Sequence, residues 1–168
     1  NRRSVGVTIA GNTCTIPPRA WPVAAIVEIS GTSAANMPEV ALLGNELASA
    51  TATYGVRVHG AAVVYLDGNT LAGPGVATAG GAGVYLRTTV IGAPMRIAVV
   101  SRNAIVGWPA AAMRVAGNAA LDGTATELEL LEVTGNVLDS GLVIERGVVP
   151  KRLRRSGNRC TATCPGLE

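Results

Sequence analysis

The sequence predicts an all-β fold, a right-handed parallel β-helix of about five to six coils. A short strand pattern recurs at Val27, Val56, Val84, Met113 and Leu142, at spacings of 29, 28, 29 and 29 residues. Each copy is apolar again two residues later, which is the alternation of a strand with one buried face. The chain contains 21 glycines and no phenylalanine, a composition that favours thin aliphatic layers joined by tight turns.

Glycine precedes the first apolar residue in three of the five copies, at Gly55, Gly83 and Gly141. Glycine suits a corner of the backbone where a side chain would be unwelcome. We therefore expect a corner at the start of these strands.

A second column of the repeat is marked by asparagine, with apolar residues three and five positions before it. Asparagine tolerates left-handed backbone and bonds neighbouring amides, so it commonly marks the bend that ends a strand. Each coil should thus contain at least two strands separated by corners. The marks are Asn12, Asn45, Asn69, Asn103, Asn136 and Asn158.

A leucine-rich-repeat solenoid is the alternative fold, because "LELLEVTGNVL" (128–138) fits the strand pattern of that family. The asparagine marks lie 33, 24, 34, 33 and 22 residues apart, and several of these spacings exceed a leucine-rich repeat. The links are also rich in Gly, Thr and Pro, which are poor helix formers. These observations favour the β-helix.

The chain divides into residues 1–22, an N-terminal cap or linker with a partial first coil, and residues 23–168, the β-helix with a basic capping coil at its C-terminal end. Pro17, Pro18 and Pro22 suit neither a strand interior nor a helix. In "KRLRRSGNRC" (151–160) strand alternation directs the charges outward, where they oppose edge-to-edge aggregation.

Stacked coils of about 29 residues with asparagine corners resemble the right-handed parallel β-helix superfamily, the pectate-lyase-like fold. That superfamily includes polysaccharide lyases, tailspikes, adhesins and injection-particle spikes. The resemblance implies carbohydrate binding in a groove on one sheet face, and trimers along the helix axis in tailspike-like members. It specifies a fold more than an activity.

One outward face combines the basic residues with aromatic ones. If Val27 and its equivalents point inward, their neighbours stack in two outward columns that gather three arginines, a tyrosine and the single histidine. Such a strip suits carboxylate, sulfate or phosphate groups along a glycan. The same columns also contain glutamates, and this mixture of charges equally fits a sheet face whose charges only keep it soluble and avoid stacking of like charges. The candidate ligand-binding residues are Arg57, His59, Tyr85, Arg87 and Arg114.

The second column predicts an outward apolar strip, which on a monomer is unusual. A loop or another subunit would cover it, and a homotrimer is the favoured assembly. The candidate interface residues are Val63, Tyr65, Ile97, Val99 and Leu130.

Residues for catalysis are few. The three aspartates, Asp67, Asp122 and Asp139, lie in turn-like segments, and Glu127, Glu129 and Glu132 form the one acidic cluster, which as a carboxylate pair could support acid and base chemistry. There is one histidine, no CxxC and no phosphate-binding loop, so we expect no metal and no cofactor.

Other sequence features limit partners and compartment. The net charge of +3 gives no nucleic-acid signature, and no apolar run is long enough to span a membrane. Cys14 and Cys160 fall on inward positions at opposite ends of the stack and should be buried. Cys160 and Cys164 lie close enough to pair, and the sequence leaves open whether they do.

Two functions follow. The first is a non-catalytic structural or recognition module of a spike, fibre or secreted surface protein, extracellular or particle-associated, that binds anionic glycans. The second is a polysaccharide lyase or hydrolase that acts on an acidic polysaccharide with the same face. The scarcity of aromatic and acidic residues favours the first.

Overall fold

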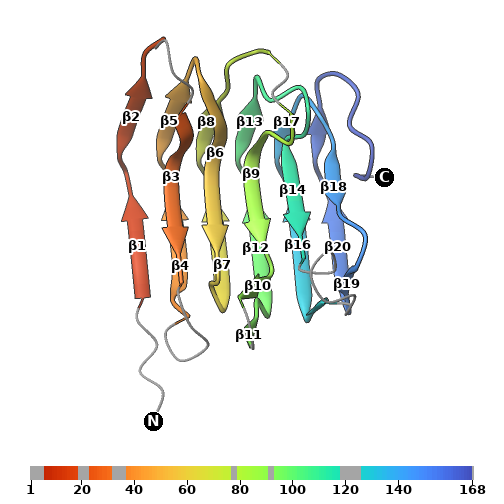
Figure 1. The fold of residues 1–168 in the computed structure, drawn as a ribbon. Coiled ribbons are helices and arrows are strands. Elements are labelled where there is room, and N and C mark those ends of the chain that lie inside the picture. Colours follow the sequence, from red (N-terminus) through yellow and green to blue (C-terminus); the bar gives the residue numbers. More distant parts are fainter. Residues whose placement is uncertain are drawn as a thin grey trace.

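The computed structural model describes residues 6–18, 23–31, 37–76, 79–90, 93–117 and 126–167. The chain forms a right-handed parallel β-helix, in which the first five coils each run through three strands, the last coil has two, and the coils stack side by side (Figure 1). None of the described residues lies in a helix, which excludes a leucine-rich repeat with helical returns. The same residues therefore contain no helix that could cross a membrane.

The first parallel sheet, sheet A, holds the opening strand of every coil. Its members, in spatial order, are β1 (Gly6–Ala10), β4 (Glu39–Leu43), β7 (Val63–Asp67), β12 (Ile97–Ser101), β16 (Leu130–Thr134) and β20 (Leu153–Ser156).

Sheet B holds the second strand of every coil, directly after the asparagine corner. Its members are β2 (Thr13–Ile16), β5 (Glu46–Ser49), β8 (Thr70–Ala72), β13 (Ala104–Val106), β17 (Val137–Leu138) and β21 (Arg159–Cys160).

Sheet C returns the chain along the opposite side of the molecule (Figure 1). Its members are β3 (Val23–Ser30), β6 (Ala52–His59), β9 (Ala82–Arg87), β14 (Met113–Ala116) and β18 (Leu142–Ile144). Two small pairs lie in the connections from sheet C back to sheet A, namely β10 (Thr89–Val90) with β11 (Ala93–Pro94), and β15 (Thr126–Leu128) with β19 (Val148–Pro150).

The core is built from apolar columns that run along the helix axis. In sheet C, Val56, Val84 and Met113 stack in register and are each at most 1% exposed. In sheet B, Leu71 and Ile105 stack in the same way. Each buried side chain of this size contributes roughly 1.5–3 kcal/mol, so the columns supply the main force that holds the coils together.

The asparagines form a continuous buried ladder between sheets A and B. Asn103 illustrates the pattern: its Nδ2 donates to Leu66 O at 2.9 Å and to Asn136 Oδ1 at 3.0 Å. Its Oδ1 accepts from the backbone N and from Nδ2 of Asn69, both at 2.9 Å. The corner predicted from the sequence is thus confirmed, and the side chains that mark it also tie neighbouring coils together.

The left-handed residue at each corner is the one before the asparagine. Gly44, Gly68 and Gly135 have φ between 59° and 65°. At the fourth corner Arg102 adopts φ of 55°, and its guanidinium pairs with Asp67 of the preceding coil. That contact compensates for a backbone conformation that normally selects glycine.

Gly55 and Gly83 are required by close packing within strands β6 and β9. A Cβ on Gly83 would lie 2.2 Å from Ile105 Cγ2, and one on Gly55 would lie 2.6 Å from the carbonyl oxygen of Gly83. Neither glycine is among those with positive φ. The indole of Trp108, which is 2% exposed, fills the space that these glycines leave.

Residues 6–16 of the segment assigned to a cap form β1 and β2, which pair in register with β4 and β5 as a regular coil. Residues 1–5 and 19–22 of that segment, Pro22 included, lie outside the described part of the chain.

Candidate functional site

The outer face of sheet C brings the predicted basic and aromatic residues into two adjacent rows. The first row places Glu28, Arg57, Tyr85 and Arg114 in register across β3, β6, β9 and β14. The second row places Ser30, His59, Arg87 and Ala116 in register on the same strands. We call this set of outward side chains, together with Tyr54 and Glu145, the sheet C cluster.

Aromatic rings form the centre of the sheet C cluster. The ring centroids of Tyr54 and Tyr85 are 4.8 Å apart, and those of His59 and Tyr85 are 5.7 Å apart. The Arg57 guanidinium lies 5.4 Å from the centre of the Tyr54 ring. These contacts hold the polar heads in defined positions, because rings in tilted contact restrict one another and an arginine over a ring is attracted to its face.

Tyr54 was not among the residues predicted from the sequence. Strict alternation backward from the buried Val56 would place Tyr54 inside the helix. The ring instead contacts Tyr85 and Arg57 on the outside, so the alternation breaks at Gly55. The glycine between the two residues is the signal that could have revealed this change of face.

Two ion pairs close the cluster at its ends. Arg57 Nη1 lies 3.3 Å from Glu28 Oε1, and Arg114 Nη1 lies 3.2 Å from Glu145 Oε1. The side chains are partly exposed, from 24% for Arg114 to 42% for Glu28, so a solute can reach both pairs. With Arg87, three arginines face two glutamates, and the face keeps a net positive charge.

The histidine is neutral at physiological pH. Burial lowers the pKa of His59 below its ordinary value, the cations of Arg57 and Arg87 lower it further, and Glu28 opposes them. Arg57 Nε donates to His59 Nε2 at 2.7 Å, which requires that nitrogen to be unprotonated. Burial raises the pKa of Tyr85, so its hydroxyl stays protonated and can donate a hydrogen bond.

Three described carboxylates outside the sheet C cluster, Glu129, Glu132 and Asp139, each have a different partner. Glu129 lies 3.7 Å from Arg96, and Glu132 lies 3.5 Å from Arg154 on the next strand. Asp139 accepts a hydrogen bond from the backbone N of Gly107 at 2.6 Å. The structure therefore does not bring these groups together as an acid and base pair.

No group of three potential metal ligands occurs in the described part of the chain. Asp122 and the side chain of Glu127 lie outside the described residues.

The apolar strip lies on the outer face of sheet A. Ile97 is in register with Val63 and Leu130, and Tyr65 is in register with Val99. Tyr65 is 44% exposed, whereas Val63 is 8% exposed and contributes little surface. The other three are half-buried.

Leu43 extends the strip toward the N-terminal end, since it lies beside Asp67 in register and is 39% exposed. Three ion pairs flank the face, namely Arg96 with Glu129, Arg102 with Asp67, and Arg154 with Glu132. An apolar centre with a charged rim is typical of an interface.

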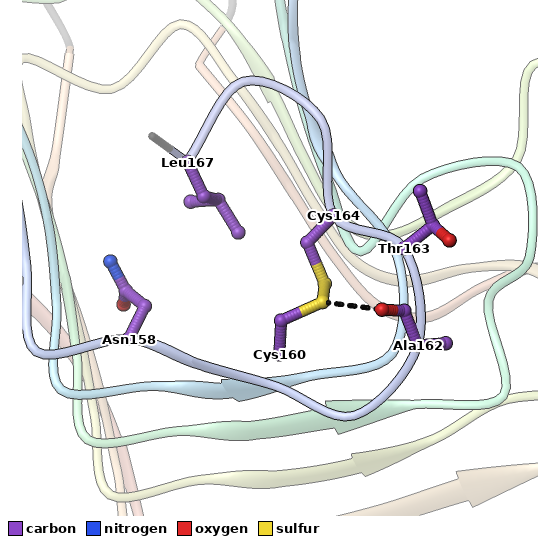
Figure 2. Close-up of a pocket in the computed structure, with 6 residues that line it drawn as sticks. All are labelled: Asn158, Cys160, Ala162, Thr163, Cys164 and Leu167. Atoms are coloured by element: carbon purple, nitrogen blue, oxygen red, sulfur yellow. Dashed lines mark hydrogen bonds between the residues drawn. A yellow bond between two sulfur atoms is a disulfide. The ribbon is translucent and has the colours of Figure 1, made fainter.

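A disulfide between Cys160 and Cys164 closes the C-terminal end of the stack (Figure 2). The bridged loop and Leu167 surround a hollow of about 350 Å³ at this end (Figure 2). The tail is anchored where Leu142 N donates to Pro165 O at 2.9 Å. The bridge that the sequence left open is thus formed.

The cysteines at inward positions are not buried. Cys14 is in register with the buried Leu47, and Cys160 with Leu138, as predicted, but both are exposed. The burial prediction was wrong because these residues belong to the end coils, which have no further coil packed on them. Cys14 is a free thiol.

The last coil carries polar groups at positions that are apolar elsewhere. Arg155 follows Val133 in the column that contains Leu42 and Leu66, and its Nη1 donates to Gly166 O at 2.6 Å. An inward charge at an open sheet end discourages pairing with another molecule.

Comparison with known proteins finds no matching family model, and no curated protein or solved structure with significant similarity.

Proposed function

We propose that this chain is a non-catalytic recognition module of a spike, fibre or secreted surface protein, and that it binds acidic glycans on the outer face of sheet C. The observation that carries the proposal is the sheet C cluster, in which three arginines and two tyrosines meet on adjacent coils. The stacked parallel sheets and the asparagine ladder support assignment to the pectate-lyase-like superfamily, among its tailspike-like and adhesin-like members.

Each group in the cluster has a role suited to an acidic sugar. An arginine guanidinium binds a carboxylate or a sulfate through two parallel hydrogen bonds. Tyr54 and Tyr85 offer ring faces and hydroxyls on which a sugar can pack and form hydrogen bonds. Neighbouring coils are about 4.8 Å apart, so a glycan aligned with the helix axis would meet a new row of side chains at each step.

An enzyme acting with this face would need a carboxylate that is not held in an ion pair, and the sheet C cluster has none. Glu28 and Glu145 both pair with arginines, and a general acid or base needs access to the reacting group. An enzyme that used this face would release shorter products from an acidic polysaccharide, and Arg114→Ala or Arg87→Ala would abolish the release. Such products from the wild-type protein would replace the recognition proposal.

The test is affinity electrophoresis through gels that contain polygalacturonate, chondroitin sulfate or neutral dextran. The acidic polymers should retard the wild-type protein and dextran should not. Arg114→Ala should weaken binding about 10- to 150-fold, because a hydrogen bond to a charged group is worth about 1.5–3 kcal/mol.

Arg154→Ala is the matched control, since it removes an arginine from an ion pair with Glu132 on sheet A and leaves the cluster intact. Equal weakening by the two variants, or no retardation by either acidic polymer, would contradict the proposal.

We also propose that the chain associates with itself through the apolar strip of sheet A, with a homotrimer as the favoured assembly. The exposed Leu43 and Tyr65 and the charged rim support this interface. Light scattering on the wild-type protein and on Tyr65→Lys tests it: the wild type should have the mass of a trimer and the variant that of a monomer. A monomeric wild-type protein would contradict the assembly.

The disulfide supports an extracellular or particle-surface setting, because such bridges persist in oxidising compartments.

A further inference from the structure

We infer that, in the free protein, Glu28 and Glu145 occupy the positions at which the carboxylates of the ligand bind. The sheet C cluster therefore selects a glycan whose carboxylates lie about two coils apart, and the glycan binds by displacing both glutamates. The inference rests on the proposed function and names its ligand more closely.

The charged side chains follow a fixed order across five successive strands. Glu28 on β3 comes first, followed by Arg57 on β6, the Tyr85 row on β9 and Arg114 on β14. Glu145 follows directly after β18, where its backbone N donates to Val115 O at 2.9 Å. Carboxylates therefore bracket a cationic and aromatic stretch that is three strands wide.

The two outer arginines define the spacing of the ligand's charges. Arg57 and Arg114 lie on strands separated by one intervening strand, which places them about 10 Å apart along the axis. Tyr85 lies on the intervening strand, and its ring centroid is 4.8 Å from that of Tyr54. A short acidic glycan laid over these rings would bring one carboxylate to each arginine.

Each of the two arginines is already bound to a carboxylate. The Arg57–Glu28 and Arg114–Glu145 contacts, at 3.3 Å and 3.2 Å, are of the kind that a uronate would form. An incoming carboxylate must therefore compete with a protein carboxylate of the same chemistry. Both glutamates lie partly exposed at the ends of the site, so each can turn into solvent when it is displaced.

The competition has a modest expected size. Partly exposed ion pairs contribute about 0.5–1 kcal/mol, and removal of one competitor should therefore tighten binding about two- to fivefold. Glu28→Gln and Glu145→Gln should each show this gain. Glu129→Gln, which removes the same charge from an ion pair on sheet A, should leave the affinity unchanged.

A variant with a shorter carboxylate side chain distinguishes occupancy of Arg114 by Glu145 from an effect of net charge alone. Glu145→Asp keeps the negative charge but shortens the side chain by one methylene, so it cannot maintain the contact of 3.2 Å with Arg114. If Glu145 acts by occupying Arg114, the Asp variant should also bind about two- to fivefold more tightly than the wild type.

The experiment is isothermal titration of the wild type and the four variants with a galacturonic acid tetrasaccharide, with a sulfated chondroitin tetrasaccharide as a second probe. Unfolding curves confirm that each variant is folded. Tighter binding of galacturonate by Glu28→Gln, Glu145→Gln and Glu145→Asp, with no gain for Glu129→Gln, supports the inference.

Two results overturn it and they are distinguishable. If Glu145→Gln gains affinity and Glu145→Asp does not, the glutamate acts through net charge alone, and the proposed function stands without this inference. If neither probe binds the wild type or the Gln variants, the proposed function and the inference both fail.

Discussion

Replacement of Asn103 by alanine should destabilise the protein far more than the same change at the end of the ladder. Asn103 is 2% exposed, and its side chain takes part in five hydrogen bonds with Leu66, Asn69, Ser101 and Asn136. The substitution leaves the backbone N–H of Asn69 buried without its acceptor, at a cost of about 1–3 kcal/mol. The other lost bonds and the vacated space raise the expected loss to about 3–5 kcal/mol.

The assay is urea unfolding followed by circular dichroism, analysed by linear extrapolation. A loss of about 3–5 kcal/mol is a large part of the 5–15 kcal/mol that stabilises typical domains. Asn12→Ala is the matched control, because Asn12 lies in the exposed first coil and its Nδ2 donates to Ala10 O there. It should cost less than about 1 kcal/mol. Equal losses for the two variants would refute the role of the ladder as a buried connection between coils.

Three further predictions concern packing, the bridge and pH. Gly83→Ala should cost about 1–3 kcal/mol, since its Cβ would overlap Ile105, and urea unfolding measures this. Reduction of Cys160–Cys164 should lower the free energy of unfolding by about 2 kcal/mol, the loop-entropy value for so short a loop, and thermal melts with and without reductant measure it. Stability should fall as the pH drops below about 6.5 toward the lowered pKa of His59, because the unfolded chain then binds the proton more readily than the folded chain. Urea unfolding across this pH range should show a smaller fall for His59→Gln.

Each of these predictions has a control or a contradicting result. Gly6→Ala adds a Cβ that meets no atom within 4 Å, so it should be neutral, and a loss equal to that of Gly83→Ala would contradict the packing argument. An unchanged melting temperature under reductant would show that the bridge does not restrain the tail. A pH dependence identical in the wild type and in His59→Gln would assign the effect to other groups.

The rows of the sheet C cluster could be predicted because the repeat fixes register. Val56, Val84 and Met113 recur at nearly constant spacing, and in a strand the neighbour of a buried residue faces outward. Arg57, Tyr85 and Arg114 therefore had to stack once the fold was correct. The asparagine corners followed from a second column of the same repeat.

The contacts within the cluster could not be predicted from spacing. Tyr54 joined the outer face because the alternation breaks at Gly55, a glycine required by the carbonyl oxygen of Gly83 and by the ring of Trp108, both from other coils. The pairing of Arg114 with Glu145 depends on how the chain leaves β18. Long-range packing and side-chain rotamers decide such features, and neither can be inferred from a local sequence pattern.

The corners show the same limit. Asparagine was expected to mark the bend because it tolerates left-handed backbone, and it does mark the bend, but the residue before it is the left-handed one, as at Gly68 and Arg102. The asparagine side chain is instead extended between coils, where each amide meets the next. A buried ladder of this kind becomes visible only when several coils are placed in register.

The measurement that tests the central claim most directly is a map of backbone amide shifts, by two-dimensional NMR, as a galacturonic acid tetrasaccharide is added. The account predicts that shifts concentrate on β6, β9 and β14 around Tyr85, and that the methyl-esterified tetrasaccharide leaves them unchanged. Shifts confined to the basic coil at 151–159, or an equal response to the esterified sugar, would contradict the claim that the sheet C cluster recognises acidic glycans.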